Sequence, residues 1–314
     1  MLLLADSREI AARLCGAERD VRPLGPGDGA RLPRFLRDAL LAGRNPVAAA
    51  ELPLPGWSLA IAVEDAPRSQ FDALSAVPGG AEALPHRLLA VAGTGRGFHG
   101  QRGRPWVALR GNLHLVAFSR VDLPAAASVG PLAALPAVAV TEAIDALPGF
   151  AGRAAIKWVN DVLLDGRKVA GVLTRTWSRG NRVTGVLLGI GLDVETVPGL
   201  PDDPLARGAT SLAAAVPPGV AAPGLAAAFS AIARTLAAGL DALAAGRGAE
   251  LVARYRARAS FLGRTVEIVP DPLLPGETAK PPIRGRARAL GDQMELWIEG
   301  HDRPVTRGRL RVLD

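Results

Sequence analysis

Residues 155–194 constrain the fold most strongly, because their pattern predicts a meander of β-strands. Short apolar runs predict strands at 155–158, 162–164, 167–176 and 182–190. Asp165-Gly166 lies between the second and third of these strands, and it supplies the two positive φ angles that a type I′ hairpin turn needs. The last strand is rich in Val, Leu and Ile, as expected of a buried strand. We therefore expect an apolar sheet at the centre of the chain.

Four polar side chains fall at the strand ends and turns of this meander: Lys157, Asn160, Asp161 and Lys168. Side chains at such positions can converge on one pocket. Asn160 and Asp161 can orient Lys157, or they can form a plain Asx turn. Lys168 can assist with phosphates, or it can simply lie along the hairpin.

A second stretch, residues 93–106, combines glycines with arginines. Glycine lets a backbone approach a ligand closely, and the arginine guanidinium is a planar donor for phosphate oxygens. Between Thr94 and Val121 there are five arginines and no acidic residue, so the segment should attract an anion. We expect His99 to be a loop residue rather than a catalytic base, and His114 to be structural rather than a ligand.

Three motifs resemble, in order and spacing, the core of the biotin protein ligases within the wider biotin/lipoate ligase superfamily. They are Lys157-Trp158-Val159-Asn160-Asp161, Gly166-Arg167-Lys168-Val169-Ala170-Gly171-Val172-Leu173 and Gly189-Ile190-Gly191-Leu192-Asp193-Val194. The Gly/Arg loop of the family is matched by Arg102-Gly103-Arg104-Pro105-Trp106 with Gly111-Asn112-Leu113, and residues 207–212 resemble its Ala-Thr-Ser-Leu segment. Linked motifs are far more specific than any one alone. The resemblance runs from about Trp57 to the C-terminus.

The resemblance implies an α+β fold with a mixed central β-sheet and packed helices, like the class II aminoacyl-synthetase-like biotin/lipoate ligase fold. Short alternating strands after residue 260 predict a small antiparallel barrel, as the SH3-like C-terminal domain of the family requires. We expect an N-terminal α/β extension at 1–50, a catalytic domain at 51–259 and the C-terminal domain at 260–314. Residues 45–55, with three prolines, are expected to be a linker.

The resemblance also implies an ATP-dependent, AMP-forming ligase that uses ATP, biotin and Mg²⁺. Such an enzyme forms biotinyl-5′-AMP and transfers biotin to a lysine of a biotin carboxyl carrier domain. Lys157 is then expected to bridge the carboxylate and the α-phosphate, with catalytic roles also for Arg96 and Arg102. Roles in binding biotin or ATP fall on Ser69, Gln70, Arg104, Trp106, Asn112, Trp158, Asn160, Asp161, Lys168, Gly171, Gly189, Gly191 and Asp193, and a weak metal-binding role falls on Asn160 and Asp161.

The chain departs from the family pattern in the Gly/Arg loop. Alignment on Trp106 puts Gln101 and His99 where the family has arginines. Alignment on residues 95–97 keeps Arg96 facing the pocket but needs a three-residue insertion at 98–100, and we prefer this register. Asp193 replaces the usual Asn, which is tolerable near phosphate only if its carboxylate binds metal or turns away.

Two further features of the pocket carry expectations of their own. Ser69 and Gln70 would replace a Thr and an Asn that line the ligand pocket in the family. Ser69, with Asp72 three residues later, fits an ordinary helix capping box equally well. Gly189 and Gly191 are expected to let the backbone approach a flat bicyclic ligand.

Composition excludes several other classes of protein. An apolar content of 49% with 21% charged residues is typical of a folded protein, and we expect no apolar run to reach the length of about 18 residues that a membrane span needs. Residues 1–5 lack the features of a signal peptide, so we place the chain in the cytoplasm. Cys15 is the single cysteine and is expected to be a small core residue.

The net charge of +7 invites a nucleic-acid interpretation, but aromatic residues make up only 4% of the chain and leave few platforms for stacking bases. Helices expected at 7–15 and 32–42 are separated by a loop rather than by the tight turn of a helix-turn-helix, so we do not expect DNA binding. The sequence leaves open whether the protein forms a homodimer.

Two other functions also stay open. The chain can activate lipoate or another acyl acid. Alternatively, the altered Gly/Arg loop and Gln70 fit a ligand-binding relative that kept the pocket and lost the transfer step.

Overall fold

The computed structural model describes residues 1–25, 27–199, 208–270 and 281–314. Parts of three expected segments lie outside the described residues: the loop at 198–204, the start of the motif at 207–212, and the loop at 271–282 with its turn at Gly276.

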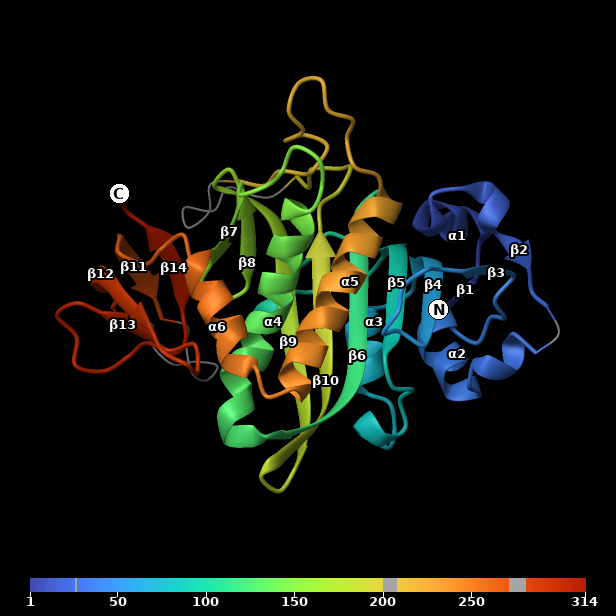
Figure 1. The fold of residues 1–314 in the computed structure, drawn as a ribbon, viewed down its shortest axis with the longest axis horizontal. Helices are drawn as coiled ribbons and strands as arrows, with labels where there is room; N and C mark the ends of the chain where they lie inside the picture. Colours follow the sequence, from blue (N-terminus) through green and yellow to red (C-terminus); the bar gives the residue numbers. More distant parts are fainter. Residues whose placement is uncertain (26, 200–207, 271–280) are drawn as a thin grey trace.

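A mixed ten-stranded sheet forms the centre of the molecule (Figure 1). Its strands are β1 (Leu2–Ala5), β2 (Arg22–Pro23), β3 (Ala48–Glu51), β4 (Leu59–Ala66), β5 (Leu88–Gly95), β6 (Leu113–Pro124), β7 (Ala154–Lys157), β8 (Asp161–Leu164), β9 (Arg167–Arg179) and β10 (Arg182–Leu192). They lie in the order β2-β3-β1-β4-β5-β6-β10-β9-β8-β7. β1, β4 and β5 run parallel to one another. Neighbouring strands from β5 through β6, β10, β9 and β8 to β7 are all antiparallel. The expected mixed central sheet is confirmed.

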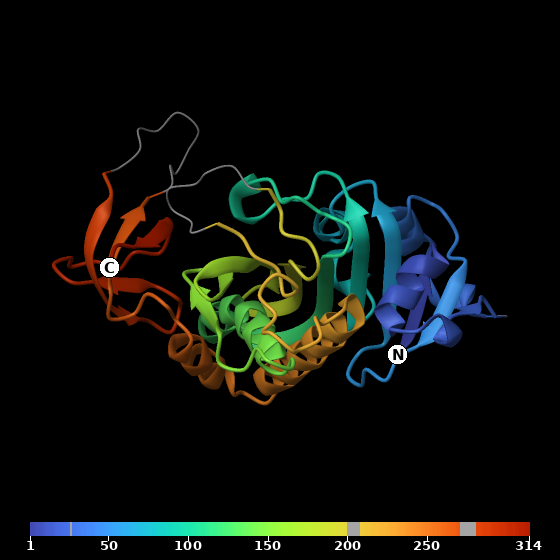
Figure 2. The same cartoon turned by 90° about the horizontal axis from the view of Figure 1, so that it is seen from above.

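Helices cover both faces of this sheet (Figure 2). One face packs against α1 (Arg8–Cys15), α4 (Ala125–Asp145) and α5 (Leu225–Ala244), with α6 (Gly248–Ala257) beside α4. The other face packs against α2 (Arg34–Leu41) and α3 (Gln70–Ser75). A proline in the middle of this Ala-rich segment predicts a kink or a later helix start at Pro136, but the helix begins at Ala125 and continues through both Pro131 and Pro136.

The N-terminal extension continues the same sheet. β1 lies between β3 and β4, so the segment expected to be a linker contains a strand, Ala48–Glu51, and that part of the prediction was wrong. Ile10 of α1 is buried in one core, whereas Leu36 of α2 is buried in the other. The two helices therefore lie on opposite faces of the sheet and do not form a helix-turn-helix pair. Cys15 packs against the first core, and burial raises the pKa of its thiol to about 11.

The strand meander predicted for residues 155–194 is confirmed. Asp165 and Gly166 have φ angles of 51° and 80°, as the hairpin prediction requires. β7, β8, β9 and β10 then follow as adjacent antiparallel strands, so residues at their ends reach one edge of the sheet.

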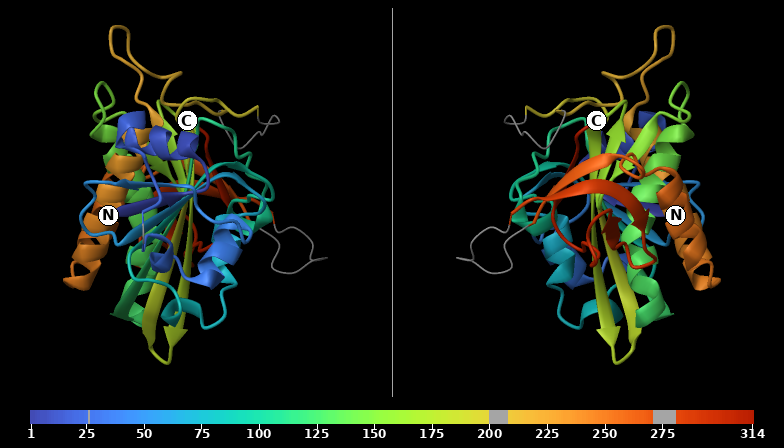
Figure 3. Two further views of the ribbon diagram at one scale, coloured as in Figure 1. Left: turned by 90° about the vertical axis from the view of Figure 1, so that its right-hand side faces the viewer. Right: turned by 90° about the vertical axis from the view of Figure 1, so that its left-hand side faces the viewer.

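The C-terminal segment forms a separate antiparallel sheet, which lies at the opposite end of the molecule from β1 to β3 (Figures 1 and 3). Its strands are β11 (Thr265–Val269), β12 (Ile283–Leu290), β13 (Leu296–Ile298) and β14 (Arg309–Val312), in the order β13-β12-β11-β14. The segment docks on α4 at Gly130, where a Cβ atom would lie 1.8 Å from the carbonyl oxygen of Asp292. Only glycine permits this approach.

Two helices, α4 and α5, are long and apolar enough to cross a membrane by length and composition alone. The sequence prediction that no apolar run reaches that length was therefore wrong. In the fold, 78% of the apolar window of α4 and 56% of that of α5 is buried against other elements, as in core helices.

Candidate functional site

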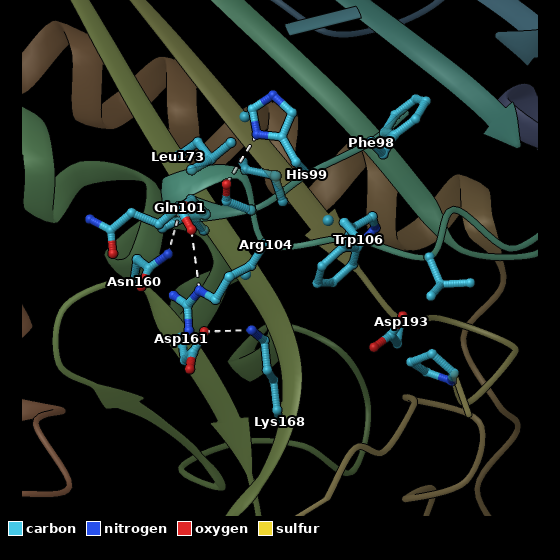
Figure 4. Close-up of a pocket in the computed structure, with 18 of the residues that line it drawn as sticks. Phe98, His99, Gln101, Arg104, Trp106, Asn160, Asp161, Lys168, Leu173 and Asp193 are labelled. Atoms are coloured by element: carbon cyan, nitrogen blue, oxygen red, sulfur yellow. Dashed lines mark hydrogen bonds and ion pairs between the residues drawn. The ribbon is translucent and has the colours of Figure 1, made fainter. Parts of the chain in front are cut away.

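A cavity of about 1040 Å³ opens where the meander, the Gly/Arg loop and the C-terminal segment meet. Most of its floor comes from β7 to β10, and one wall comes from residues 98–107 (Figure 4). Gly308, Arg309 and Leu310 of the C-terminal segment complete the lining. Twelve of the residues assigned to the site from the sequence line this cavity: Ser69, Arg104, Trp106, Lys157, Trp158, Asn160, Asp161, Lys168, Gly171, Gly189, Gly191 and Asp193.

Two lysines and one carboxylate form the charged centre of the cavity. Lys157 ends β7 and lies opposite Asp161 in the β7–β8 pairing. The Nζ atom of Lys168 lies 2.6 Å from Oδ1 of Asp161 and 5.7 Å from the centre of the Trp106 ring. Burial alone would raise the pKa of Asp161, but the two lysines, with a smaller contribution from Arg104, hold that pKa below its ordinary value. Asp161 is thus ionised. Its carboxylate holds the Lys168 side chain in the cavity, so this side chain does not simply lie along the hairpin.

Asn160 and Trp158 connect the cavity to its surroundings. The amide nitrogen of Asn160 donates to the carbonyl of Val172 at 3.0 Å, which ties the turn to β9. Trp158 is buried, and its indole N–H donates to the carbonyl of Met294 at 2.9 Å. The residue that follows the key lysine therefore anchors the C-terminal segment.

Aromatic side chains occupy the space over the glycines of β10. A Cβ atom at Gly191 would lie 2.3 Å from the Trp106 ring, and one at Gly189 would lie 2.9 Å from Phe71. Gly171 on β9 leaves room for the same Trp106 ring. We expected these glycines to admit a flat ligand against the backbone. In the structure they leave room for the aromatic walls of the cavity, and the approach of a flat ligand to Gly189 and Gly191 stays a prediction.

His114 supports Trp106 from inside the fold. The indole N–H of Trp106 donates to Nδ1 of His114 at 3.3 Å, so Nε2 carries the proton and donates to the carbonyl of Leu109 at 3.1 Å. Burial lowers the pKa of His114 to about 4, and the imidazole is neutral at physiological pH. His114 also lines the cavity, and its being structural rather than a ligand stays a prediction.

Asp193 is buried at the edge of the cavity and is 1% exposed. Its Oδ1 atom accepts from the amide of Asn112 at 2.8 Å. Burial raises the pKa of Asp193 to about 8, so the carboxyl is protonated at neutral pH. We expected the carboxylate to bind metal or to turn away from phosphate. In the structure the carboxyl does neither. It is neutral, and it takes the place of the side-chain amide of the family's usual Asn.

Asn112 does not line the cavity, although it holds one of its walls. Its Oδ1 atom accepts from the backbone N–H groups of Val194, Glu195 and Thr196. It is fully buried, so it acts through the loop that follows β10. A role in contacting ligand is replaced by a role in shaping the loop.

The Gly/Arg loop folds as a small hairpin over the cavity. The N–H of Trp106 donates to the carbonyl of Phe98, and that of Gly100 donates to the carbonyl of Arg104. This hairpin brings His99, Gln101 and Arg104 to the cavity. Arg96 and Arg102 are not among the residues that line it, which differs from the register that we preferred. The catalytic roles assigned to these two arginines stay predictions.

The base of the hairpin is attached to α3. Both carboxylate oxygens of Asp72 lie 2.9 Å from Nε2 of His99, and the Gly100 carbonyl and this carboxylate together raise the pKa of His99. Ser69 caps α3 by accepting from the N–H of Asp72, whose carboxylate pairs with His99. Ser69 also lines the cavity, and its role in binding ligand stays a prediction. Gln70 is buried, donates to the carbonyl of Val91, and is not among the residues that line the cavity.

Sequence reasoning missed Phe71, Phe98 and the C-terminal contribution to the cavity. Phe98 packs edge-on against His114, with ring centres 5.6 Å apart. The alternation of apolar residues around Phe71 is a weak signal for a cavity wall. Nothing in the pattern of residues 308–310 indicates that they line the cavity, because their place there depends on how the two sheets dock.

Comparisons with known proteins agree with this geometry. The Biotin/lipoate A/B protein ligase family matches residues 82–193. The fold resembles the biotin protein ligase from Aquifex aeolicus in complex with biotin and ATP, with a TM-score of 0.57, 17% identity and coverage of 81% of this chain and 98% of that one. The fold and the cavity thus define a protein of the biotin/lipoate ligase class.

The biotin–[acetyl-CoA-carboxylase] ligase of Mycobacterium tuberculosis is 32% identical over 279 residues, which are 87% of this chain and 91% of that protein. The chain therefore belongs to the biotin protein ligase family. Other relatives match over less than half of their own length. The bifunctional ligase/repressor BirA of Bacillus subtilis is 35% identical over 42% of this chain and 40% of its own, and the Paracoccus denitrificans ligase is 43% identical over 32% and 41%.

Proposed function

We propose that the protein is an ATP-dependent biotin ligase that forms biotinyl-5′-AMP and transfers the biotinyl group to a lysine of a carboxyl carrier domain. The arrangement of Lys157, Asp161 and Lys168 at the floor of the cavity carries this proposal. Relatives named as biotin–[acetyl-CoA-carboxylase] ligases support it. The chain carries its cationic groups on strands, where they are in place before substrates bind.

The first step joins biotin to the nucleotide. A biotin carboxylate oxygen attacks the α-phosphorus of ATP, the bond from that phosphorus to the bridging oxygen breaks, and pyrophosphate leaves. Negative charge develops on the α-phosphoryl oxygens, and the Lys157 ammonium is the group that we assign to stabilise it. Lys168, which is paired with Asp161, adds a second positive charge in the same cavity.

The second step opens the mixed anhydride. The acceptor lysine, as a neutral amine, attacks the biotinyl carbonyl, AMP leaves, and the amine proton passes to solvent. Trp106 and the 98–106 hairpin cover the cavity from the side of the Gly/Arg loop. We propose that this cover retains the adenylate until the acceptor arrives.

The side chains of the cavity can be compared with the ligands that the expected Mg²⁺ site would need. Asp161 is paired with Lys168, the amide nitrogen of Asn160 donates to Val172, and Asp193 is protonated at neutral pH. Among the described residues no cluster of three His, Cys, Asp or Glu forms. This donor set does not fit a resident metal, and we propose that Mg²⁺ arrives bound to the phosphates of ATP.

We extend the proposal to the rest of the molecule in three ways. The C-terminal sheet is SH3-like and closes the cavity through residues 308–310. The reaction takes place in the cytoplasm. The expected units are a catalytic domain from residue 51 to 259, preceded by the extension at 1–50 and followed by the C-terminal domain at 260–314.

Incubation of the protein with ATP, biotin and a carrier domain tests the function. We expect the carrier to gain the mass of one biotinyl group, and a carrier whose acceptor lysine is replaced by arginine to gain none. Transfer of lipoyl or octanoyl groups at a comparable rate would move the assignment to the lipoate branch. Adenylate formation without transfer would show a relative that lost the second step.

A further inference from the structure

The N-terminal extension contacts the two loops that form one wall of the cavity. The first loop, residues 107–112, follows Trp106, and the second, residues 193–199, follows β10. Val107 and Val197, one from each loop, line the cavity and are exposed at its mouth. The position of these loops therefore determines the shape of the entrance.

Helix α1 holds both loops with two side chains from one of its faces. Glu9 and Arg13 are four residues apart, so they project from the same side of the helix. An Nη atom of Arg13 lies 2.8 and 2.7 Å from the two carboxylate oxygens of Glu195 in the second loop. Glu9 accepts from Arg110 of the first loop at 2.9 Å.

The contact between Glu9 and Arg110 is reinforced through β4. Arg110 also pairs with Glu64, whose second carboxylate oxygen accepts from the hydroxyl of Ser7 at 3.0 Å. Ser7 is the N-cap of α1, and its hydroxyl accepts from the N–H groups of Glu9 and Ile10. The start of α1 is thus connected through Glu64 to the loop after Trp106.

The two loops are also joined to each other. The hydroxyl of Thr196 donates to the carbonyl of Arg110 at 3.1 Å, and Asn112 accepts from three consecutive backbone N–H groups of the second loop. At Gly111 a Cβ atom would lie 2.6 Å from the Glu195 carboxylate. Movement of either loop therefore moves the other.

We infer that α1 is a positioning element for the cavity, in which Glu9 and Arg13 fix the wall formed by residues 107–112 and 193–199. This gives the N-terminal extension a role in substrate affinity, and the inference about affinity rests on the proposed function. Helix α1 is itself fixed, because Ile10 and Leu14 on the adjacent face of the helix are buried in the core. A rigid helix that grips two loops narrows the positions they can occupy before substrates bind.

The test uses the full chain with Glu9→Gln and Arg13→Gln, singly and together. Arg8→Gln is the matched control, since Arg8 lies on the same helix but donates to the carbonyl of Val21 within the extension. In the ligand-free protein, amide hydrogen exchange in the two loops should become about three-fold to ten-fold faster in the double variant, as expected from the loss of two partly exposed pairs. The control should exchange at the wild-type rate.

Kinetics separate a positioning role from a merely structural one. The KM for biotin should rise by a similar factor while kcat and Tm stay near wild type. The reciprocal pair Arg13→Glu with Glu195→Arg should restore both loop exchange and KM. Unchanged exchange, failure of the reciprocal pair, or faster exchange across the whole chain with a lower Tm would overturn the inference. Because the exchange measurement needs no substrate, an inactive wild-type protein would refute the proposed function and leave the positioning role testable.

Discussion

The two sides of the cavity are held in different ways. Lys157, Asp161 and Lys168 stand on β7 to β9, where pairing of each strand with its neighbour fixes them. The 98–106 hairpin is held by a few backbone bonds and by the contact between His99 and Asp72. We infer from this difference that the charged residues on the strands act in the chemical step, whereas the hairpin retains the intermediate.

Loss of Lys157 should have the largest effect. Lys157→Ala is expected to reduce adenylate formation by about 10²–10³-fold, because a charge aimed at the reacting phosphate is removed. Its Tm should stay close to wild type. Release of pyrophosphate in a single turnover measures the effect, and Arg175→Ala, an exposed change on β9, is the control. Wild-type release by Lys157→Ala would remove Lys157 from the mechanism.

The arginines of the hairpin should affect retention more than chemistry. Arg104→Ala is expected to increase escape of the adenylate about ten- to a hundred-fold, as for loss of a hydrogen bond to a charged group. The escape is measured by labelling of bystander lysines. Arg102→Ala and Arg96→Ala should act in the same direction but less strongly, because neither side chain is among those that line the cavity. An Arg96→Ala variant that leaks most would restore the register that we preferred from the sequence.

The neutral state of Asp193 gives a smaller, pH-dependent effect. Its folded pKa of about 8 lies above the ordinary value, so its stabilising contribution is complete below about pH 4 and is lost as the pH rises through 8. Asp193→Asn keeps an acceptor for Asn112 and cannot ionise. The variant should therefore gain several degrees in Tm at pH 8.5 and much less at pH 5. Equal Tm differences at both pH values would contradict the protonated state.

The contact between His99 and Asp72 should give the smallest effect. The pKa of His99 is raised, so the contact is strongest below the ordinary histidine value and weakens as the pH rises through the raised pKa. Asp72→Asn should lower the pKa of His99 in an NMR titration. Proteolysis within the hairpin should then be faster, and biotin with ATP should slow it. A hairpin that is cleaved equally fast with and without these ligands would argue against closure.

The same contrast explains how much could be predicted from the sequence. The β7–β10 meander and its polar residues follow local rules of periodicity and turn chemistry, and Asp165-Gly166 adopts the positive φ angles that those rules demand. The conformation of the hairpin could not be predicted, because it depends on Asp72 and on Trp106 packing over Gly191, which are distant in sequence. The neutral state of Asp193 likewise depends on burial, which the local pattern does not reveal.

Exchange of pyrophosphate into ATP tests most directly the claim that the cavity activates a biotin carboxylate. The wild-type protein should catalyse exchange that requires biotin, and lipoate should support it orders of magnitude less well, because a pocket with polar partners for a ureido group rejects a ligand that lacks it. Lys157→Ala should reduce the biotin-dependent exchange by about 10²–10³-fold. Exchange that is absent with biotin, or as fast with lipoate as with biotin, would contradict the account.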